Sequence, residues 1–194
     1  MMDTGKEPRT GRAWIAMVLQ SGADKAALAD VPCVPFRAEF LLACEQNICG
    51  SYNRNWMCPP HVGDIYALIA QAQQYTHAIV YQTIGKLEDS FDYEGMVAAK
   101  DHHRAVSARI QQHLSARNDI LHLTAGACTV CERCAALDEA PCRYPALALP
   151  SLEAYGIAVS ELAGICGLPY INGVNTVTYF GAILYDPKEA TCQS

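Results

Sequence analysis

Seven of the ten cysteines are gathered in two short segments of the chain, and their spacing is typical of metal ligands. The more regular segment, GACTVCERCAALDEAPCRYP, spans residues 126–145 and carries Cys128, Cys131 and Cys134 in a C-x2-C-x2-C run. Cys142 follows after seven intervening residues. Three thiolates at this spacing can wrap a loop around one cubane, each on a different iron, as in bacterial ferredoxins. The second cysteine segment (126–145) therefore predicts a [4Fe–4S] cluster. The assignment of Cys142 to the same cluster is an inference, because the last cysteine of a ferredoxin run can serve another cluster.

The first cysteine segment (44–60), CEQNICGSYNRNWMCPP, offers three thiols, Cys44, Cys49 and Cys58, separated by four and eight residues. A cysteine followed by proline recurs in iron–sulfur loops, and Cys58 precedes two prolines. Three thiolates leave one iron of a cubane without a cysteine. Cys33, His61, a water or a substrate atom could take that position, so we expect a second cluster with a coordination position that can be open for chemistry.

Zinc is the alternative metal, bound structurally by the four cysteines of the second segment. Zinc sites more often pair two C-x2-4-C hooks across a longer gap, so iron–sulfur is the favoured interpretation. Three functions remain open: a redox protein or reductase component, a non-catalytic zinc protein that binds a partner, and a carrier of metal or clusters. The sequence indicates no particular reaction, because it contains no Walker loop, dinucleotide fingerprint, nucleophile elbow or HExxH motif.

Length, composition and charge indicate the size of the core, the cellular compartment and the kind of partner to expect. A chain of 194 residues with 51% hydrophobic residues can bury a core without cross-links. The segment before Trp14 is polar, the apolar run after it is too short for a signal peptide, and no stretch could span a membrane. We therefore expect a cytoplasmic protein with reduced thiols. The net charge of -6 and the lack of a basic run argue against nucleic acid, which leaves a redox protein as the expected partner.

The remaining pattern predicts a flexible tail over residues 1–12 and one metal-binding domain over 13–194. Its fold class is α/β: a single layered domain with a central sheet flanked by helices and two cysteine-rich metal loops. The hydrophobic periodicities predict strands over Trp14–Leu19, His77–Ile84, Ile120–Thr124 and Val174–Tyr185. They predict helices over Asp64–Gln74, Tyr93–Arg117 and Ser151–Cys166.

Polar and aromatic residues near the cysteine segments, and one pair of histidines, are further candidates for a role at the site. Tyr52, Asn53, Asn55 and Trp56 lie between two proposed ligands, where they can shield a centre and donate hydrogen bonds to its sulfurs, or where Trp56 can anchor the loop. The adjacent His102 and His103 are expected to be a solvated pair. Glu153 and Tyr155 can face the second cysteine segment, but a structural role in a helix is the more common one.

CGSYNRNWMCPP, GACTVCERCAALDEAPCRYP and the following PSLEAYGI together resemble an uncharacterised bacterial and archaeal family of predicted metal-binding proteins. The resemblance covers about residues 40 to 185. It implies a small soluble protein with cysteine-bound metal and no known reaction. Carried onto this chain, it implies that the metal ligands are Cys44, Cys49, Cys58, Cys128, Cys131, Cys134 and Cys142. Cys33, Cys166 and Cys192 fall outside the motifs.

Overall fold

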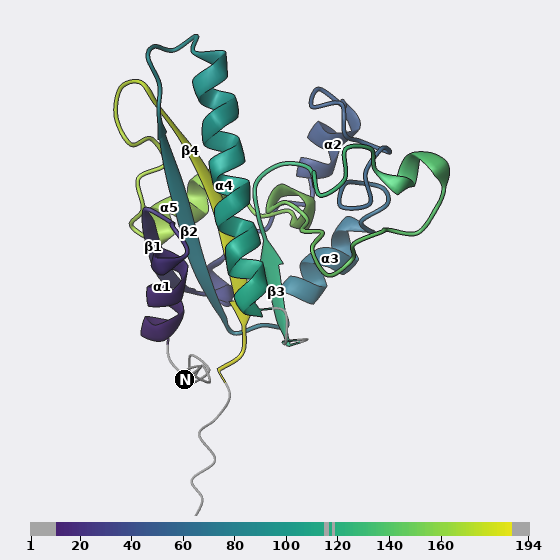
Figure 1. Cartoon of the computed structure of the whole chain (residues 1–194). Coiled ribbons are helices and arrows are strands. Elements are labelled where there is room, and N and C mark those ends of the chain that lie inside the picture. Colours follow the sequence, from purple (N-terminus) through teal and green to yellow (C-terminus); the bar gives the residue numbers. More distant parts are fainter. Residues whose placement is uncertain (1–10, 115–116, 118, 188–194) are drawn as a thin grey trace, which may run out of the picture.

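A central antiparallel sheet organises the protein. The computed structural model describes residues 11–114, 117 and 119–187, and within them four strands pair in the order β1-β2-β4-β3 (Figure 1). The strands are β1 (Lys25–Asp30), β2 (His77–Lys86), β3 (Ile120–Leu123) and β4 (Thr176–Tyr185). Helices cover both faces, so the predicted mixed α/β class with a central sheet flanked by helices is confirmed.

The two long central strands carry the sheet. β2 and β4 pair along their whole length, from His77 opposite Tyr185 to Lys86 opposite Thr176. Both are rich in β-branched and aromatic residues, which suit a pleated and buried surface. The three strands predicted at these two places and at β3 are confirmed. β1 was missed, because its sequence, KAALAD, is rich in alanine and lacks a strand pattern.

One face of the sheet is covered by α1 (Gly11–Gln20) and α4 (Tyr93–Leu114). The buried side chains of this layer come from both helices and from β2 and β4: Trp14, Val18, Val106, Ile110, Leu114, Ile79, Tyr81, Ile183 and Tyr185. The strand predicted over Trp14–Leu19 is therefore wrong. Trp14 and Val18 are four residues apart and bury the same helical face, a spacing that the short apolar run had hidden. Gly11 and Arg12, assigned to a flexible tail, are the first residues of this helix.

The other face packs against α3 (Ile65–Ala72), α5 (Val159–Ile165) and the short 3-10 helix η3 (Glu153–Tyr155). α3 begins as predicted, because the Asp64 carboxylate accepts hydrogen bonds from the backbone N–H groups of Tyr66 and Ala67 at 3.0 Å. The continuous helix predicted over Ser151–Cys166 is wrong. Gly156 adopts a φ of 70°, and a Cβ there would lie 3.1 Å from the Arg37 carbonyl oxygen, so the chain turns at this glycine and α5 starts later.

The expectation that His103 is solvated is wrong. Its side chain is buried in a polar network between α4 and the sheet. Its Nδ1 lies 2.9 Å from the Thr83 hydroxyl, and its Nε2 lies 3.2 Å from the Thr124 hydroxyl. The neighbouring His102 is exposed. Adjacent residues on a helix point about 100° apart, so one member of the pair faces the sheet and the other faces water.

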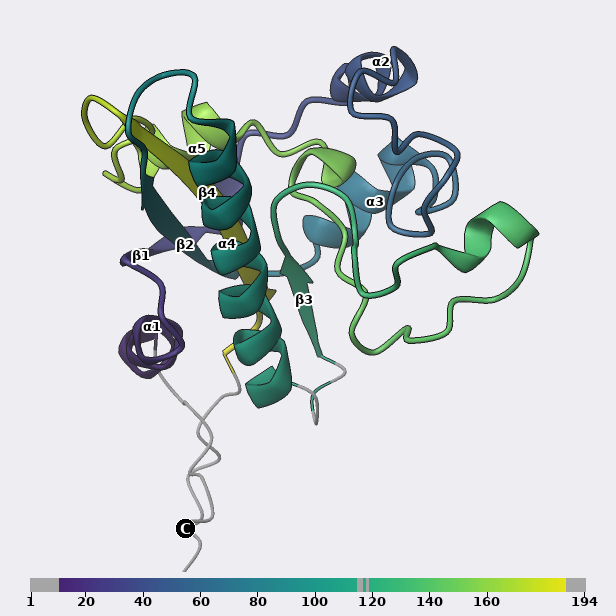
Figure 2. The same ribbon diagram turned by 45° about the horizontal axis from the view of Figure 1, so that its top comes forward.

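Both cysteine segments lie beyond the β3 edge of the sheet, on the same side of the molecule (Figures 1 and 2). The second is an excursion whose ends are closed by hydrogen bonds from the Thr124 N–H to the Pro150 carbonyl and from the Leu152 N–H to the Thr124 carbonyl, both 3.0 Å. The first leaves the scaffold where the Arg37 N–H donates to the Gly156 carbonyl at 2.6 Å. Residues 150–158 therefore hold the bases of both segments.

Two shorter features complete the description. The first cysteine segment is not wholly a loop, since Cys44 lies in α2 (Phe40–Glu45). Short 3-10 helices also occur at η1 (Val31–Cys33) and η2 (Ala135–Asp138). Residues 1–10 of the predicted tail, and Cys192, lie outside the described residues. Of the helices in the described ranges, none is both long and apolar enough to cross a lipid bilayer.

Candidate metal centre

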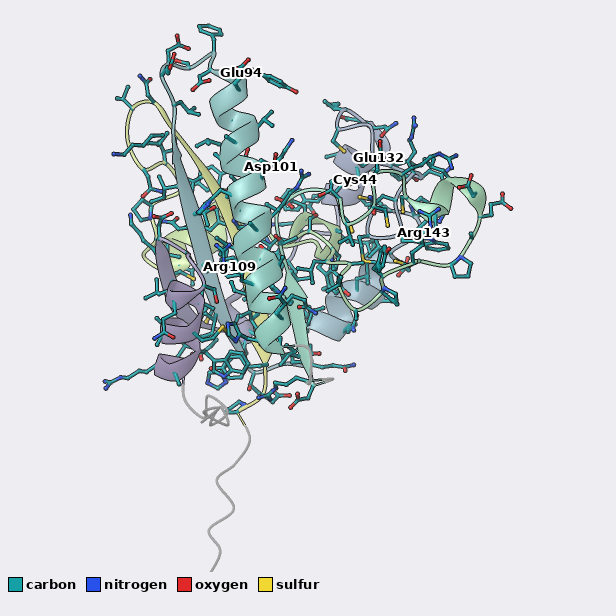
Figure 3. All side chains as sticks on the ribbon, viewed as in Figure 1. Cys44, Glu94, Asp101, Arg109, Glu132 and Arg143 are labelled. Atoms are coloured by element: carbon teal, nitrogen blue, oxygen red, sulfur yellow. The ribbon has the colours of Figure 1, made fainter. Side chains whose placement is uncertain are left out.

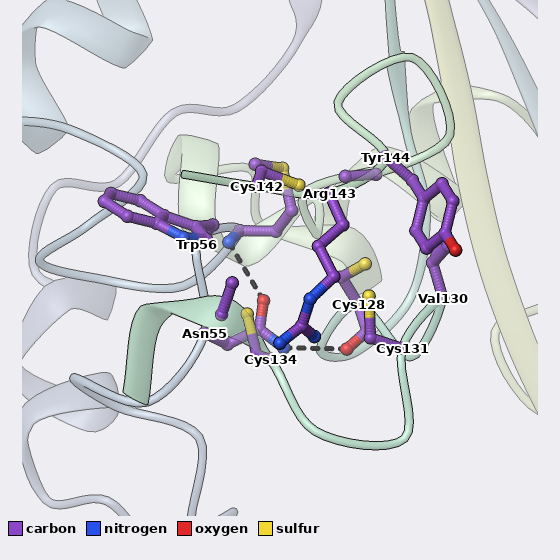
Figure 4. A pocket seen from close by; sticks show the side chains of 12 residues that line it. Asn55, Trp56, Cys128, Val130, Cys131, Cys134, Cys142, Arg143 and Tyr144 are labelled. Atoms are coloured by element: carbon purple, nitrogen blue, oxygen red, sulfur yellow. Dashed lines mark hydrogen bonds between the residues drawn. The ribbon is translucent and has the colours of Figure 1, made fainter. Parts of the chain in front are cut away.

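The four cysteines of the second segment line one pocket. Cys128, Cys131, Cys134 and Cys142 all contribute to its wall, together with residues of the first segment (Figure 4). Gly126 opens the segment with a φ of 73°, which lets the backbone turn sharply before Cys128. The four ligands inferred from spacing are therefore brought together in space.

Little free space remains in this four-cysteine pocket. Its cavity volume is about 20 Å³. Arg143 also lines it, and the Arg143 guanidinium donates to the Arg133 carbonyl oxygen at 2.8 Å. Because Arg143 is exposed, its side chain can swing outward. A four-iron group would need that movement, whereas a single ion would not.

The three cysteines of the first segment line a different and much larger cavity of about 500 Å³. Its wall is mostly apolar, with Phe40 and Ile48 beside Cys44, Cys49 and Cys58, and it also includes Ala127 and Ser151. This three-cysteine cavity contains one carboxylate, that of Glu153 from η3. A structural role in a helix was the expectation for Glu153. Its approach to Cys44 depends on the turn at Gly156, which the local sequence pattern does not reveal.

The two other candidates for the fourth position lie elsewhere. Cys33 is exposed at the end of η1 and does not line the three-cysteine cavity. His61 does not line it either, and its ring packs against Trp56 with the centroids 5.0 Å apart. Glu153 is therefore better placed than either to reach the three thiols.

The two cysteine segments are joined by two hydrogen bonds. The Asn55 side-chain amide donates to the Cys128 carbonyl oxygen at 2.7 Å, and the Trp56 indole N–H donates to the Ala140 carbonyl oxygen at 2.9 Å. Both side chains were candidates for hydrogen bonds to sulfur, but these bonds end on backbone carbonyls. Trp56 thus anchors one segment to the other. Figure 3 shows Cys44 of the first segment and Glu132 and Arg143 of the second on the same side of α4.

The electrostatics of the thiols also connects the segments. Burial and, to a smaller extent, the neighbouring thiolates of Cys49, Cys44, Cys128 and Cys134 together raise the pKa of Cys58 to about 12. Burial likewise raises the pKa of Cys44, with smaller contributions from Cys49, Glu153 and Glu45. Thiolates so close together cannot all be charged unless a cation compensates them. A bound metal would supply that cation and release the thiol protons.

The donor set suits a thiophilic metal, although its present spacing is wide. All nine cysteines in the described part of the chain are free thiols. Within those same residues, no group of three or more Cys, His, Asp or Glu side chains is compact enough to hold a single metal ion. A tetrahedral zinc with Zn–S bonds of about 2.3 Å requires sulfurs roughly 3.8 Å apart. The thiols would have to move closer for zinc than for a cluster whose irons are spread over a cubane.

Comparison with known proteins agrees with this donor chemistry. No curated protein and no solved structure matches the chain. A family model described as a predicted metal-binding protein matches residues 28–185, a range that contains both cysteine segments, α4 and the whole of β2 to β4. The resemblance inferred from the motifs is thereby confirmed: the chain belongs to the uncharacterised DUF2284 family of predicted metal-binding proteins.

Proposed function

We propose that the protein is an iron–sulfur redox protein or reductase component with two centres in contact. The observation that carries the proposal is the separation of seven thiols into two adjoining cavities, one lined by four cysteines and one by three. One centre is fully ligated by cysteine, and the other keeps an exchangeable position. When bound, such clusters accept and donate single electrons.

The four-cysteine pocket suits an electron-transfer centre. Its C-x2-C-x2-C run can give each of three irons a thiolate, and Cys142 completes the set. Burial raises the pKa of Cys128, and backbone hydrogen bonds from Val130 and Leu149 offset part of this rise by stabilising the thiolate. Hydrogen bonds to ligand sulfurs are among the features that tune cluster potentials.

The three-cysteine cavity suits a reactive centre. Its wall is mostly apolar, and its 500 Å³ is within the range of volumes that hold small ligands. The Glu153 carboxylate can either ligate the position that lacks a cysteine or exchange a proton with a substrate bound there. Asn55 and Trp56 keep the two cavities together, so an electron would have a short path between the centres.

A redox partner protein and a reducing compartment such as the cytosol complete the proposal, since free thiols in this number persist where glutathione and thioredoxin keep them reduced. The zinc alternative would make the second segment a structural element for partner binding. The carrier alternative would make both sites temporary, with transfer of the metal or cluster to an acceptor protein.

Anaerobic purification followed by iron, zinc and acid-labile sulfide analysis tests the proposal. We expect a brown protein with iron and sulfide in equal amounts, and broad visible absorption from thiolate-to-iron charge transfer. Cyanide or an added thiol should perturb the spectrum of one cluster and leave the other unchanged. Stoichiometric zinc without sulfide, in protein never exposed to air, would establish the structural zinc interpretation. Rapid transfer to an apo-acceptor would favour the carrier.

A further inference from the structure

A third cavity lies between α4 and the segment that follows β3, and the proposed metal function does not use it. This α4 cavity has a volume of about 290 Å³. It shares Ala127 with the three-cysteine cavity and Cys128 with the four-cysteine pocket, so it adjoins both. Its polar side chains come from α4 and from the end of β3 with the segment after it: Arg104 and Ser107 from α4, and Thr124 and Thr129 from the second region.

Arg104 has hydrogen-bonding capacity that the protein does not use. One terminal nitrogen donates to the Asp101 carboxylate at 3.0 Å. The Nε atom is buried and has no partner, although the side chain as a whole remains 29% exposed. A buried donor on a charged group that lacks an acceptor costs free energy, and a shift of the side chain that brings Nε to an acceptor in the cavity would relieve that cost. The planar fork of an arginine matches a carboxylate in particular.

The Ser107 and Thr124 hydroxyls form a second polar point on the wall. They are 2 and 7% exposed, respectively, and their oxygens lie 2.8 Å apart. Behind them, the Ser107 hydroxyl contacts the Tyr81 hydroxyl at 2.9 Å, which fixes the pair in place. Hydroxyls held in this way are oriented donors or acceptors for a ligand atom at that end of the cavity.

Apart from Thr129 and Cys128, the rest of the wall is apolar and made of small or aliphatic residues. Those side chains are Ala105, Ala108, Ala125, Ala127, Val130, Leu147 and Leu149. The alanines on α4 leave the space open, because any larger side chain there would enter it. Such a wall favours a ligand with a short apolar body over a fully hydrated inorganic anion.

We propose that the α4 cavity binds a small monocarboxylate whose carboxylate is held by Arg104 and whose apolar body lies against the alanines and leucines. At about 30 Å³ per water-sized unit, the volume suits a ligand of roughly ten non-hydrogen atoms. The site would place this ligand against the backbone of Cys128, beside the four-cysteine pocket. The proposal does not depend on which metal the cysteines hold.

Calorimetric titration of the full-length protein, as purified without oxygen, tests the site with benzoate as the probe. Benzamide is the uncharged control of the same size, and inorganic phosphate is the anion without an apolar body. We expect saturable benzoate binding and at least tenfold weaker binding of the other two. Arg104→Met should weaken benzoate binding at least tenfold, whereas Lys100→Met, which removes a positive charge from the same helix outside the cavity, should not.

A second variant keeps the test independent of Arg104. Ala108→Leu places bulk in the cavity from an exposed helix position, so it should abolish benzoate binding without unfolding the protein, as judged by circular dichroism. Absence of saturable benzoate binding to the wild type, or equal binding of benzamide, would overturn the assignment of a carboxylate. Unchanged binding in Ala108→Leu would show that benzoate binds elsewhere, and equal binding of phosphate would reduce the site to one for free oxyanions.

Discussion

Replacing Asn55 by alanine tests whether the two cysteine segments depend on each other. Asn55 is 8% exposed, and its side chain holds both segments. Its amide nitrogen donates to the Cys128 carbonyl oxygen at 2.7 Å, and its amide oxygen accepts from the Met57 N–H at 3.0 Å. Alanine removes both interactions and leaves a carbonyl and an N–H without partners in a buried place.

The expected cost follows from those two groups. A buried polar group left unsatisfied costs about 1–3 kcal/mol, and about 1–2 kcal/mol for each of these two groups, which belong to the half-buried residues Met57 and Cys128, gives a loss of roughly 2–4 kcal/mol. Where the contact between the segments is required for metal binding, the same free energy lowers metal affinity. Each 1.4 kcal/mol is a factor of ten, so affinity at the four-cysteine pocket should fall by about 30-fold to several hundredfold.

The assay is competition with a chelator, read as metal retained per chain, together with urea unfolding. Asn172→Ala is the matched control. Asn172 also loses a comparable set of bonds, to Lys25, Thr178 and the Pro169 carbonyl, but it lies outside both cysteine segments. We expect both variants to be destabilised and only Asn55→Ala to lose metal. Equal metal retention in the two variants would refute the dependence of one segment on the other.

Three further predictions follow from the same structure. Cys131→Ser should lose one centre and lower the melting temperature, while Cys33→Ser should retain both centres; loss of a cluster in Cys33→Ser would show that the first site is closed by four cysteines. Burial lowers the pKa of His103 from 6.5 to about 4, so the native state binds fewer protons than the unfolded state. The stability that the native state gains from keeping His103 neutral is fully present above pH 6.5 and is lost as the pH falls towards 4. Urea unfolding should therefore show about 3 kcal/mol of acid-dependent stability that His103→Gln lacks and His102→Gln keeps; equal pH profiles would contradict it. Removal of metal by a chelator should increase hydrogen exchange in residues 38–64 and 125–150 and leave β2 and β4 protected; loss of protection in β2 would mean that the core needs the metal.

The local sequence pattern was sufficient to predict the elements that are long and have a regular apolar periodicity or a clear cap. β2 and β4 combine length with β-branched residues, α4 repeats its apolar positions over 22 residues, and α3 has Asp64 as its cap. The failures have local causes too. The apolar run at Trp14 fits either a helix or a strand, and the alanines of β1 fit neither well. The division between η3 and α5 depends on a positive φ at Gly156 and on the nearby Arg37 backbone, which no local pattern reveals.

Some features of the candidate site could likewise be predicted from the sequence, and others could not. Ligand spacing predicted that Cys128, Cys131 and Cys134 group together, because cysteines with two intervening residues are close in any fold. The wider gaps of the first segment and before Cys142 do not force the thiols together, and there the grouping depends on the fold. The position of Glu153 beside Cys44, the bond from Asn55 to Cys128 and the unpartnered Nε of Arg104 all join residues far apart in sequence. Such contacts are set by the packing of the sheet and α4, so a single sequence could not predict them.

The scaffold and the thiols are physically separate, and this separation explains why the metal sites can be adaptable. The seven cysteines do not contribute to either buried hydrophobic cluster of the described residues, which contain the side chains of the sheet and its covering helices. Their segments are joined to that scaffold mainly through residues 150–158, by backbone bonds at Thr124, Arg37 and Pro35. A sheet that folds from its own apolar surface does not need metal to form. The binding free energy of a metal is then available to order the cysteine segments, to move Arg143 out of the four-cysteine pocket and to draw the raised-pKa thiols into their charged form.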